Sequence, residues 1–190
     1  MQKSDPIRNI NELTAFKNYY LHIKPNPRNY LLIIFGLNTA LRISDLLNIK
    51  WGDIFDNNGK IKRHLQITET KTKKHKTIYL NNNIIYAIQN YSTETHNNNH
   101  YLFSHTNNKG TKITRVQAFR IIKEASSYCH IEGIISCHSL RKTFGYHARI
   151  QGADPAVLVD IFNHSSYEVT KRYLGIDQDD QDDIYKNIII

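Results

Sequence analysis

The chain has 190 residues, with 25 lysines and arginines against 17 aspartates and glutamates, and a formal net charge of +8 at pH 7. This length fits one domain with a sizeable core, and the positive excess favours a polyanionic partner, most simply a nucleic acid. Two cysteines exclude a disulfide framework, and the lack of any apolar run near about 18 residues excludes a secretory signal or a membrane helix, so we expect a cytoplasmic protein.

The first forty residues predict two helices behind a loose leader, residues 1–9. Asn11–Ile23 carries apolar residues at helical spacing. A Lys-Pro-Asn-Pro segment ending at Pro27 breaks that helix. The following segment, Asn29–Ala40, is almost continuously apolar but too short to span a membrane, which predicts a core helix.

A basic side chain follows this core helix. Arg42 and Asp45 are three residues apart among apolar neighbours, so the carboxylate could fix the guanidinium at the edge of the core. A guanidinium aimed in this way suits a phosphate. The alternative is an ordinary surface ion pair, worth under about 1 kcal/mol.

Alternating residues and turn signals then predict a β-hairpin. Its strands are expected at Ile61–Thr68 and Thr77–Leu80, after a turn at Asp56–Gly59, with Lys71–Lys76 as the tip. A basic hairpin suits a DNA groove or backbone, although lysines also protect a strand edge from aggregation. The side chains predicted to bind DNA are Lys60, Lys62, Arg63, Lys73, Lys74 and Lys76.

The middle of the chain predicts two more helices. Asn81–Tyr91 and Thr114–His130 have helical periodicity, and Thr114 is a suitable N-cap. Between them, Tyr101–Phe103 is expected to be extended and Thr106–Lys112 to form a loop. The fold class expected from these elements is α+β, mostly helical with a small antiparallel sheet.

The stretch from His138 to Tyr173 concentrates residue types that handle a phosphodiester. Arg141 can grip two phosphate oxygens, and His138 and His164 can exchange protons near neutral pH. Tyr173 can act as a covalent nucleophile. Each alone is more often structural, so the prediction of a site that breaks and rejoins DNA without a metal depends on the whole set. The two Cys-His dipeptides lack the spacing of a zinc site, and no metal is expected.

Local signals place the first part of this set on one helix. His138, Arg141 and Gly145 fall on one face, and the glycine leaves room for close approach by backbone or ligand. Gly152 is a plausible stop for this helix.

Two shorter helices are expected to follow. Asp154 and the proline after it form an N-cap and a first turn, and Asn163 suits a left-handed residue at the helix end. Ser165 and Glu168 fit a capping box for the last helix, which carries Tyr173 near its end.

Five short motifs together resemble the catalytic domain of the tyrosine recombinases, the phage-integrase family. They are TALRISDLLNIKWGDI, TKTKKHKTIYL, HSLRKTF, FNHSS and KRYLGI, and the resemblance covers Asn11 to the C-terminus. One departure is Asn163, which stands where the family usually has glycine. The resemblance implies the catalytic residues Arg42, Lys71, His138, Arg141, His164 and Tyr173, with Asp45 in support of Arg42.

The resemblance also implies a mechanism. Tyr173 would attack the scissile phosphate and form a 3′-phosphotyrosyl bond, while Arg42 and Arg141 hold the nonbridging oxygens. Lys71 would protonate the leaving 5′-oxygen as general acid. His138 would assist proton movement and His164 would hydrogen-bond the phosphate. No cofactor is expected.

Double-stranded DNA is the expected partner, and the protein is expected to associate into a tetramer on it. Accessory DNA-binding proteins are further candidate partners. No association with a membrane is expected. The expected location is the cytoplasm, associated with the nucleoid. Residues 1–190 are expected to form one catalytic domain without a separate core-binding domain. The tail, residues 176–190, is acidic and then apolar, so a short helix there would either cover its own core or dock on a neighbouring protomer.

Three alternatives remain open at this point. A type IB topoisomerase-like enzyme would use the same chemistry to nick and close one strand. A non-catalytic DNA-binding module would keep the basic face without needing the full set of residues. A ribonuclease could use the same histidines, lysines and arginines but would not need Tyr173.

Overall fold

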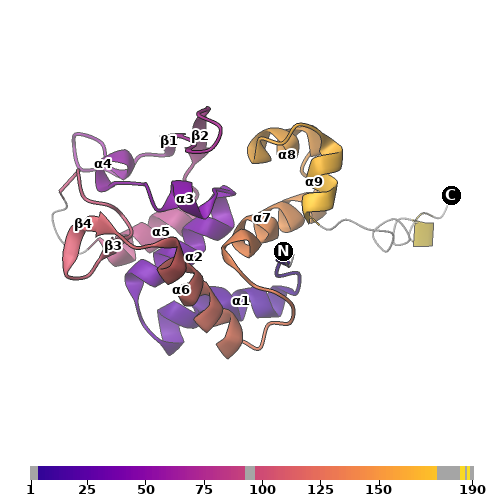
Figure 1. Ribbon diagram of the computed structural model, residues 1–190, viewed down its shortest axis with the longest axis horizontal. Coiled ribbons are helices and arrows are strands. Elements are labelled where there is room, and N and C mark those ends of the chain that lie inside the picture. The colour runs from indigo at the N-terminus through magenta and orange to yellow at the C-terminus, as the bar shows by residue number, and fades with distance from the viewer. Residues whose placement is uncertain (1–3, 93–96, 175–184, 187, 189–190) are drawn as a thin grey trace.

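Helices make up most of the described chain, and two small antiparallel hairpins accompany them (Figure 1). The computed structural model describes residues 4–92, 97–174, 185–186 and 188. The combination of many helices with two small antiparallel hairpins confirms the predicted α+β class. The elements in order are α1 Ile10–Asn18, the π-helix η1 Tyr19–Ile23, α2 Pro27–Thr39, α3 Ile43–Leu46, α4 Trp51–Ile54, β1 His64–Thr68, β2 His75–Tyr79, α5 Asn82–Tyr91, β3 Ser104–His105, β4 Asn108–Lys112, α6 Arg115–Tyr128, α7 Cys137–Ile150, α8 Pro155–Phe162 and α9 Tyr167–Leu174.

Helix α2 is the centre of the helical body, and α1, α5, α6 and α7 all contact it. It begins at Pro27, before the expected start at Asn29, because the proline is accommodated in the first turn and the Asn26 side chain accepts a hydrogen bond from the Asn29 amide at 3.0 Å. Gly36 lets α7 approach closely, since a Cβ there would lie 2.5 Å from Leu140. None of the helices within the described residues has the length and apolar character needed to cross a membrane.

The leader is docked onto the helical body, so the prediction of a loose segment is wrong for its described residues, 4–9. The Asp5 amide donates to the Ile134 carbonyl at 2.9 Å, and the Asp5 carboxylate accepts from the Ile134 amide at 2.9 Å. Ile7 is buried, and its amide donates to the Thr143 hydroxyl at 2.9 Å. A single apolar residue has no periodicity, so its burial against a distant helix leaves no local signal.

The two hairpins differ in how well the sequence predicts them. Strands β1 and β2 pair from His64–Tyr79 to Thr68–His75, so the tip is residues 69–74. Lys76 therefore lies within β2, although the sequence predicted that it belongs to the tip. Strands β3 and β4 also pair, although residues 106–112 were predicted to be a loop. That prediction is wrong because short polar strands lack the alternation that identifies a half-buried strand.

Helices α8 and α9 pack on α7 through a second, smaller core. Ala40, Leu158, Phe162 and Leu174 are buried together there. Gly145 of α7 makes this approach possible, since a Cβ on it would lie 2.5 Å from both the Phe162 ring and the Leu174 side chain. The glycine does leave room for a close approach, but the groups that approach it are two side chains and not the backbone or ligand that was predicted.

The caps of these two helices mostly follow the sequence. The Asp154 carboxylate accepts from the Ala156 amide at 2.7 Å, and Asn163 has the left-handed conformation expected, with φ 50°. The predicted capping box of Ser165 and Glu168 is wrong, because the hydroxyl that caps α9 belongs to Ser166 and accepts from the Val169 amide at 3.4 Å.

Most of the tail lies outside the described residues, and so does most of its predicted helix. Tyr185, Lys186 and Ile188 are described, and the side chains of Tyr185 and Ile188 are 80% and 59% exposed. These two side chains therefore do not cover the core.

Candidate active site

Tyr173 lies in the last turn of α9 with its ring enclosed by neighbours. The His164 ring crosses it edge-on with centroids 5.2 Å apart, and the Lys142 ammonium lies 5.3 Å from its centroid. Its hydroxyl is buried and adjoins the Arg141 guanidinium without a well-aligned hydrogen bond. Burial raises the pKa of Tyr173, and the charges of Arg141 and Arg42 oppose that rise. The resting phenol is therefore neutral and must lose a proton before it can attack.

Arg141 is buried and joins the end of α2 to the end of α8. One terminal nitrogen donates to the Ala40 carbonyl, and the other donates to the Phe162 carbonyl at 2.6 Å. Its guanidinium carbon also lies 4.6 Å from the centroid of the Phe162 ring. These contacts fix the plane of the guanidinium, whose other N–H groups are the ones suited to a phosphate.

The carboxylate beside Arg42 belongs to Glu69, at 3.0 Å, so the predicted pairing of Arg42 with Asp45 is wrong. Arg42 precedes α3 in an extended conformation, with ψ 145°, so the helical i, i+3 geometry does not apply to it. Asp45 instead accepts a hydrogen bond from the Thr70 amide at 2.9 Å. It thereby anchors the β1–β2 tip beside the arginine.

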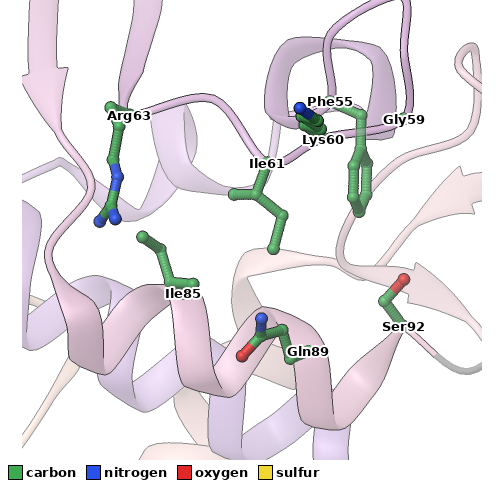
Figure 2. A pocket seen from close by; sticks show the side chains of 8 residues that line it. All are labelled: Phe55, Gly59, Lys60, Ile61, Arg63, Ile85, Gln89 and Ser92. Carbon is green, nitrogen blue, oxygen red and sulfur yellow. The ribbon is translucent and has the colours of Figure 1, made fainter.

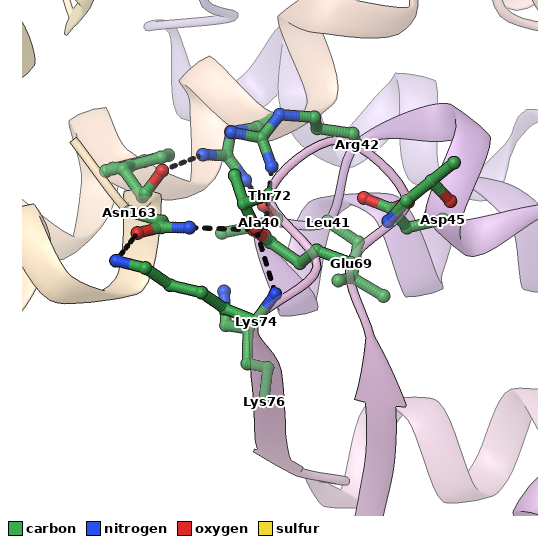
Figure 3. A network of polar contacts seen from close by, with 12 residues as sticks. Ala40, Leu41, Arg42, Asp45, Glu69, Thr72, Lys74, Lys76 and Asn163 are labelled. Atoms are coloured by element: carbon green, nitrogen blue, oxygen red, sulfur yellow. Dashed lines mark hydrogen bonds and ion pairs between the residues drawn. The ribbon is translucent and has the colours of Figure 1, made fainter.

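Glu69 is a residue of this site that the sequence did not single out. Its side chain is 1% exposed and accepts from the Thr72 hydroxyl at 2.6 Å and from the Asn163 side-chain amide at 3.0 Å (Figure 3). Burial by itself would raise the pKa of Glu69, but these two bonds and Arg42 bring it to about 2. The available signal was that Glu69 is a lone acid in a strongly basic hairpin.

The two predicted histidines lie near the same arginines. His164 stacks on Phe162 with centroids 5.3 Å apart, and its Nδ1 lies 2.9 Å from the Thr170 hydroxyl. Burial, then Arg141 and Arg42, lower the pKa of His164. Desolvation and then nearby positive charges likewise lower the pKa of His138, in the first turn of α7. Both imidazoles are therefore neutral near pH 7 and able to accept a proton.

The lysines of the β1–β2 hairpin have different surroundings. Lys71 and Lys73 are exposed at the tip. The Lys74 ammonium donates to the Asn163 side chain at 2.8 Å (Figure 3). The Lys76 ammonium donates to the Ile161 carbonyl at 2.6 Å. Burial and the charge of Arg141 lower the pKa of Lys76 to about 8. Lys74 and Lys76 thus hold the hairpin against the C-terminal end of α8.

The remaining basic residues predicted to bind DNA lie at the hairpin base. Lys62 donates to the Gly52 carbonyl at 2.9 Å. Lys60 and Arg63 line an open pocket of about 470 Å³ between the hairpin base and α5, and they share it with Ile61 and Ile85 (Figure 2). Of these three side chains, Lys62 is thus held by a contact within the protein, at α4. Within the described residues, no group of three His, Cys, Asp or Glu side chains could hold a metal ion.

Known proteins resemble this chain over most of its length. The model of the phage integrase family matches residues 8–179. The probable integrase/recombinase YoeC of Bacillus subtilis is 42% identical over 181 residues, which cover 95% of this chain and 94% of that protein. A tyrosine recombinase of Pseudothermotoga lettingae is 31% identical over 163 residues, which cover 85% of this chain and 54% of that protein.

A solved structure shares the fold. The XerH site-specific recombinase, bound to palindromic difH substrate in a post-cleavage complex, matches with a TM-score of 0.78 and 19% identity over 97% of this chain and 53% of that one. The chain thus spans nearly the whole of YoeC but only about half of these two longer recombinases.

Proposed function

The chain belongs to the phage integrase family of tyrosine recombinases, and from this premise we propose that it cuts and rejoins double-stranded DNA through a 3′-phosphotyrosyl intermediate. The observation that carries the proposal is the position of the Tyr173 hydroxyl against Arg141, with Arg42 close enough to affect the pKa of the same phenol. A nucleophile and two cations around one space are what an in-line attack on a phosphodiester requires.

In the first step, the Tyr173 oxygen bonds to phosphorus and the bond from phosphorus to the 5′-oxygen breaks. The phenol proton leaves to a base, for which neutral His138 is suited, and Lys71 supplies a proton to the departing 5′-oxygen. Arg42 and Arg141 stabilise the charge that builds on the nonbridging oxygens. A 5′-hydroxyl from a second strand then reverses these steps and releases the tyrosine.

The buried hydroxyl adds a condition to the first step. A phosphate can reach Tyr173 only if α9 or the groups that cover the hydroxyl move, because the hydroxyl has almost no accessible surface. We therefore propose that cutting is coupled to assembly of the protein into a tetramer on DNA. The exposed side chains of Tyr185 and Ile188 in the tail are suited to contacts between protomers.

The test is covalent trapping on DNA whose preferred sequence need not be known. A pool of nicked duplexes, randomised around the nick, would be incubated with the protein in excess EDTA and then denatured. We expect a protein–DNA adduct that Tyr173→Phe abolishes while DNA binding persists. Tyr167→Phe, at the start of the same helix, is the matched control and should still form it.

The same assay tests the non-catalytic alternative, and assays of supercoil relaxation and of strand exchange test the topoisomerase-like one. A non-catalytic DNA-binding module would give no adduct with any variant. A topoisomerase-like enzyme would form the adduct and relax supercoiled DNA without exchanging strands between two duplexes. An adduct that persists in Tyr173→Phe would place the nucleophile elsewhere.

A further inference from the structure

Three segments that are distant in sequence meet at one buried carboxylate, that of Glu69. They are the segment between α2 and α3 that contains Arg42, the tip of the β1–β2 hairpin, and the α8–α9 turn (Figure 3). Each of these segments bears a predicted catalytic side chain: Arg42 itself, Lys71 in the tip, and His164 next to Asn163 in the turn. The carboxylate is therefore placed to set their relative positions.

Within the hairpin, Glu69 closes the tip. Its backbone amide donates to the Lys74 carbonyl at 2.9 Å, and its carbonyl accepts from the Lys73 amide at 2.9 Å. Its carboxylate also accepts from the Thr72 hydroxyl at 2.6 Å. The loop that carries Lys71 is thus wrapped around this one residue.

The tie to the α8–α9 turn depends on the side chain of Asn163. The left-handed backbone at this position, with φ 50°, would accept glycine equally well, so the turn itself does not need an amide. The amide nevertheless uses both of its ends. Its nitrogen donates to Glu69 at 3.0 Å and its oxygen accepts from Lys74 at 2.8 Å, across 94 and 89 residues of sequence.

Two roles for a carboxylate against Arg42 can be compared. A temporary stand-in for phosphate would have to leave when DNA binds. Glu69 is unsuited to that role, because the Thr72 and Asn163 bonds would hold its charge in a site that is 1% exposed, and a buried carboxylate that loses its cation is costly. A permanent anchor needs only to hold one side of the guanidinium while other N–H groups face the DNA.

We propose that Glu69 is a positioning residue for strand cleavage, and that Asn163 extends its hold to the α8–α9 turn. Together they fix Arg42, the Lys71 loop and His164 relative to one another before DNA arrives. This inference rests on the proposed function and adds to it two residues that act on the reaction through others.

The first test measures cleavage and binding separately. Glu69→Gln keeps the size of the side chain and removes its charge. We expect the rate of adduct formation on nicked DNA to fall about tenfold or more, while the Kd for DNA changes less than about twofold, because misplaced groups slow the chemistry more than the binding. Glu132→Gln, at an exposed position, is the matched control. Faster cleavage or tighter binding in Glu69→Gln would show that Glu69 is a stand-in for phosphate instead.

Asn163→Asp supplies a second variant that keeps the shape and the left-handed conformation of the residue. It replaces the donor that faces Glu69 with a second carboxylate, so we expect it to cleave more slowly than Asn163→Gly, which only removes the bridge. Equal rates in these two variants and the parent would overturn the role of Asn163. Asn57→Asp, in an exposed turn, controls for the added charge.

The second test needs no DNA and so remains decisive if no adduct forms at all. Amide hydrogen exchange should become faster at Lys73 and at His164 together in Asn163→Gly, because the bridge joins the tip to the turn. His130→Gly, at another left-handed residue, should leave both amides unchanged. Unchanged exchange in Asn163→Gly would refute the coupling, whatever the enzyme does to DNA.

Discussion

The replacement Gly145→Ala tests whether the packing of α7 positions the nucleophile. A Cβ at this position would lie 2.5 Å from both the Leu174 side chain and the Phe162 ring, distances that no real contact sustains. The leucine end can rotate, but the Phe162 ring is fully buried and contacts both the Arg141 guanidinium and the His164 ring. Relief of the clash therefore has to move α8 or α9.

The size of the effect follows from two opposing terms. Overpacking in a core costs about 1–3 kcal/mol, and two contacts this short favour the upper part of that range. Replacing glycine by alanine inside a helix returns up to about 1 kcal/mol. The expected net loss is about 1–2 kcal/mol, which for a domain of this size lowers Tm by roughly 2–8 °C.

Thermal melts and the nicked-duplex assay together check the reasoning. Gly36→Ala is the matched control, because it creates an equally short contact with Leu140, away from α8 and α9. Both variants should lose stability, but only Gly145→Ala should also cleave more slowly at temperatures where each is folded. The reasoning fails if Gly145→Ala melts and cleaves like the parent, or if Gly36→Ala loses as much cleavage.

Four further predictions follow from the site. Arg42→Lys keeps the charge but loses the planar fork, so the rate of adduct formation should fall about 10²-fold or more with little change in DNA affinity, as gel shifts would measure. A DNA substrate with a 5′-bridging sulfur has a leaving group that needs no general acid. It should therefore restore cleavage to Lys71→Ala and give no special benefit to Lys74→Ala. The reverse result would assign the general acid to Lys74. Because burial and the two arginines lower the pKa of His164, the contribution of His164 to the free energy of unfolding should be fully present above its ordinary pKa of 6.5 and decline below it, and His164→Gln should lessen that decline in acid titrations of stability. Deleting residues 183–190 should impair assembly on DNA, measured by sedimentation, more than it lowers Tm.

Local signals in the sequence predicted most of the helices and their ends. Thr114 begins a helix as expected, and Asp154 and Asn163 bound α8. These signals are reliable because a cap or a first-turn proline acts on backbone groups within three or four residues of itself. The order of elements, and hence the set of side chains that could meet, was therefore accessible from the sequence.

The partners within the site were less accessible. Arg42 was assigned to Asp45 by its spacing in sequence, but its actual partner is Glu69, in the hairpin. The carbonyls that hold Arg141 belong to Ala40 and Phe162, 101 and 21 residues away. A residue spacing predicts contacts only within a regular element, and neither arginine meets its partners within one.

Asn163 shows how one residue can satisfy a local rule and also serve a distant contact. Its backbone follows the rule for a helix end, which any glycine would also satisfy, so the sequence gives no reason to expect more of it. The hydrogen bonds of its side-chain amide to Glu69 and Lys74 join the segment carrying His164 to the hairpin carrying Lys71. Replacement by glycine would remove these hydrogen bonds without destabilising the turn. The fold of this chain can therefore tolerate a change at Asn163 that the arrangement of its catalytic groups cannot, which is why cleavage and hydrogen exchange, and not stability alone, have to be measured there.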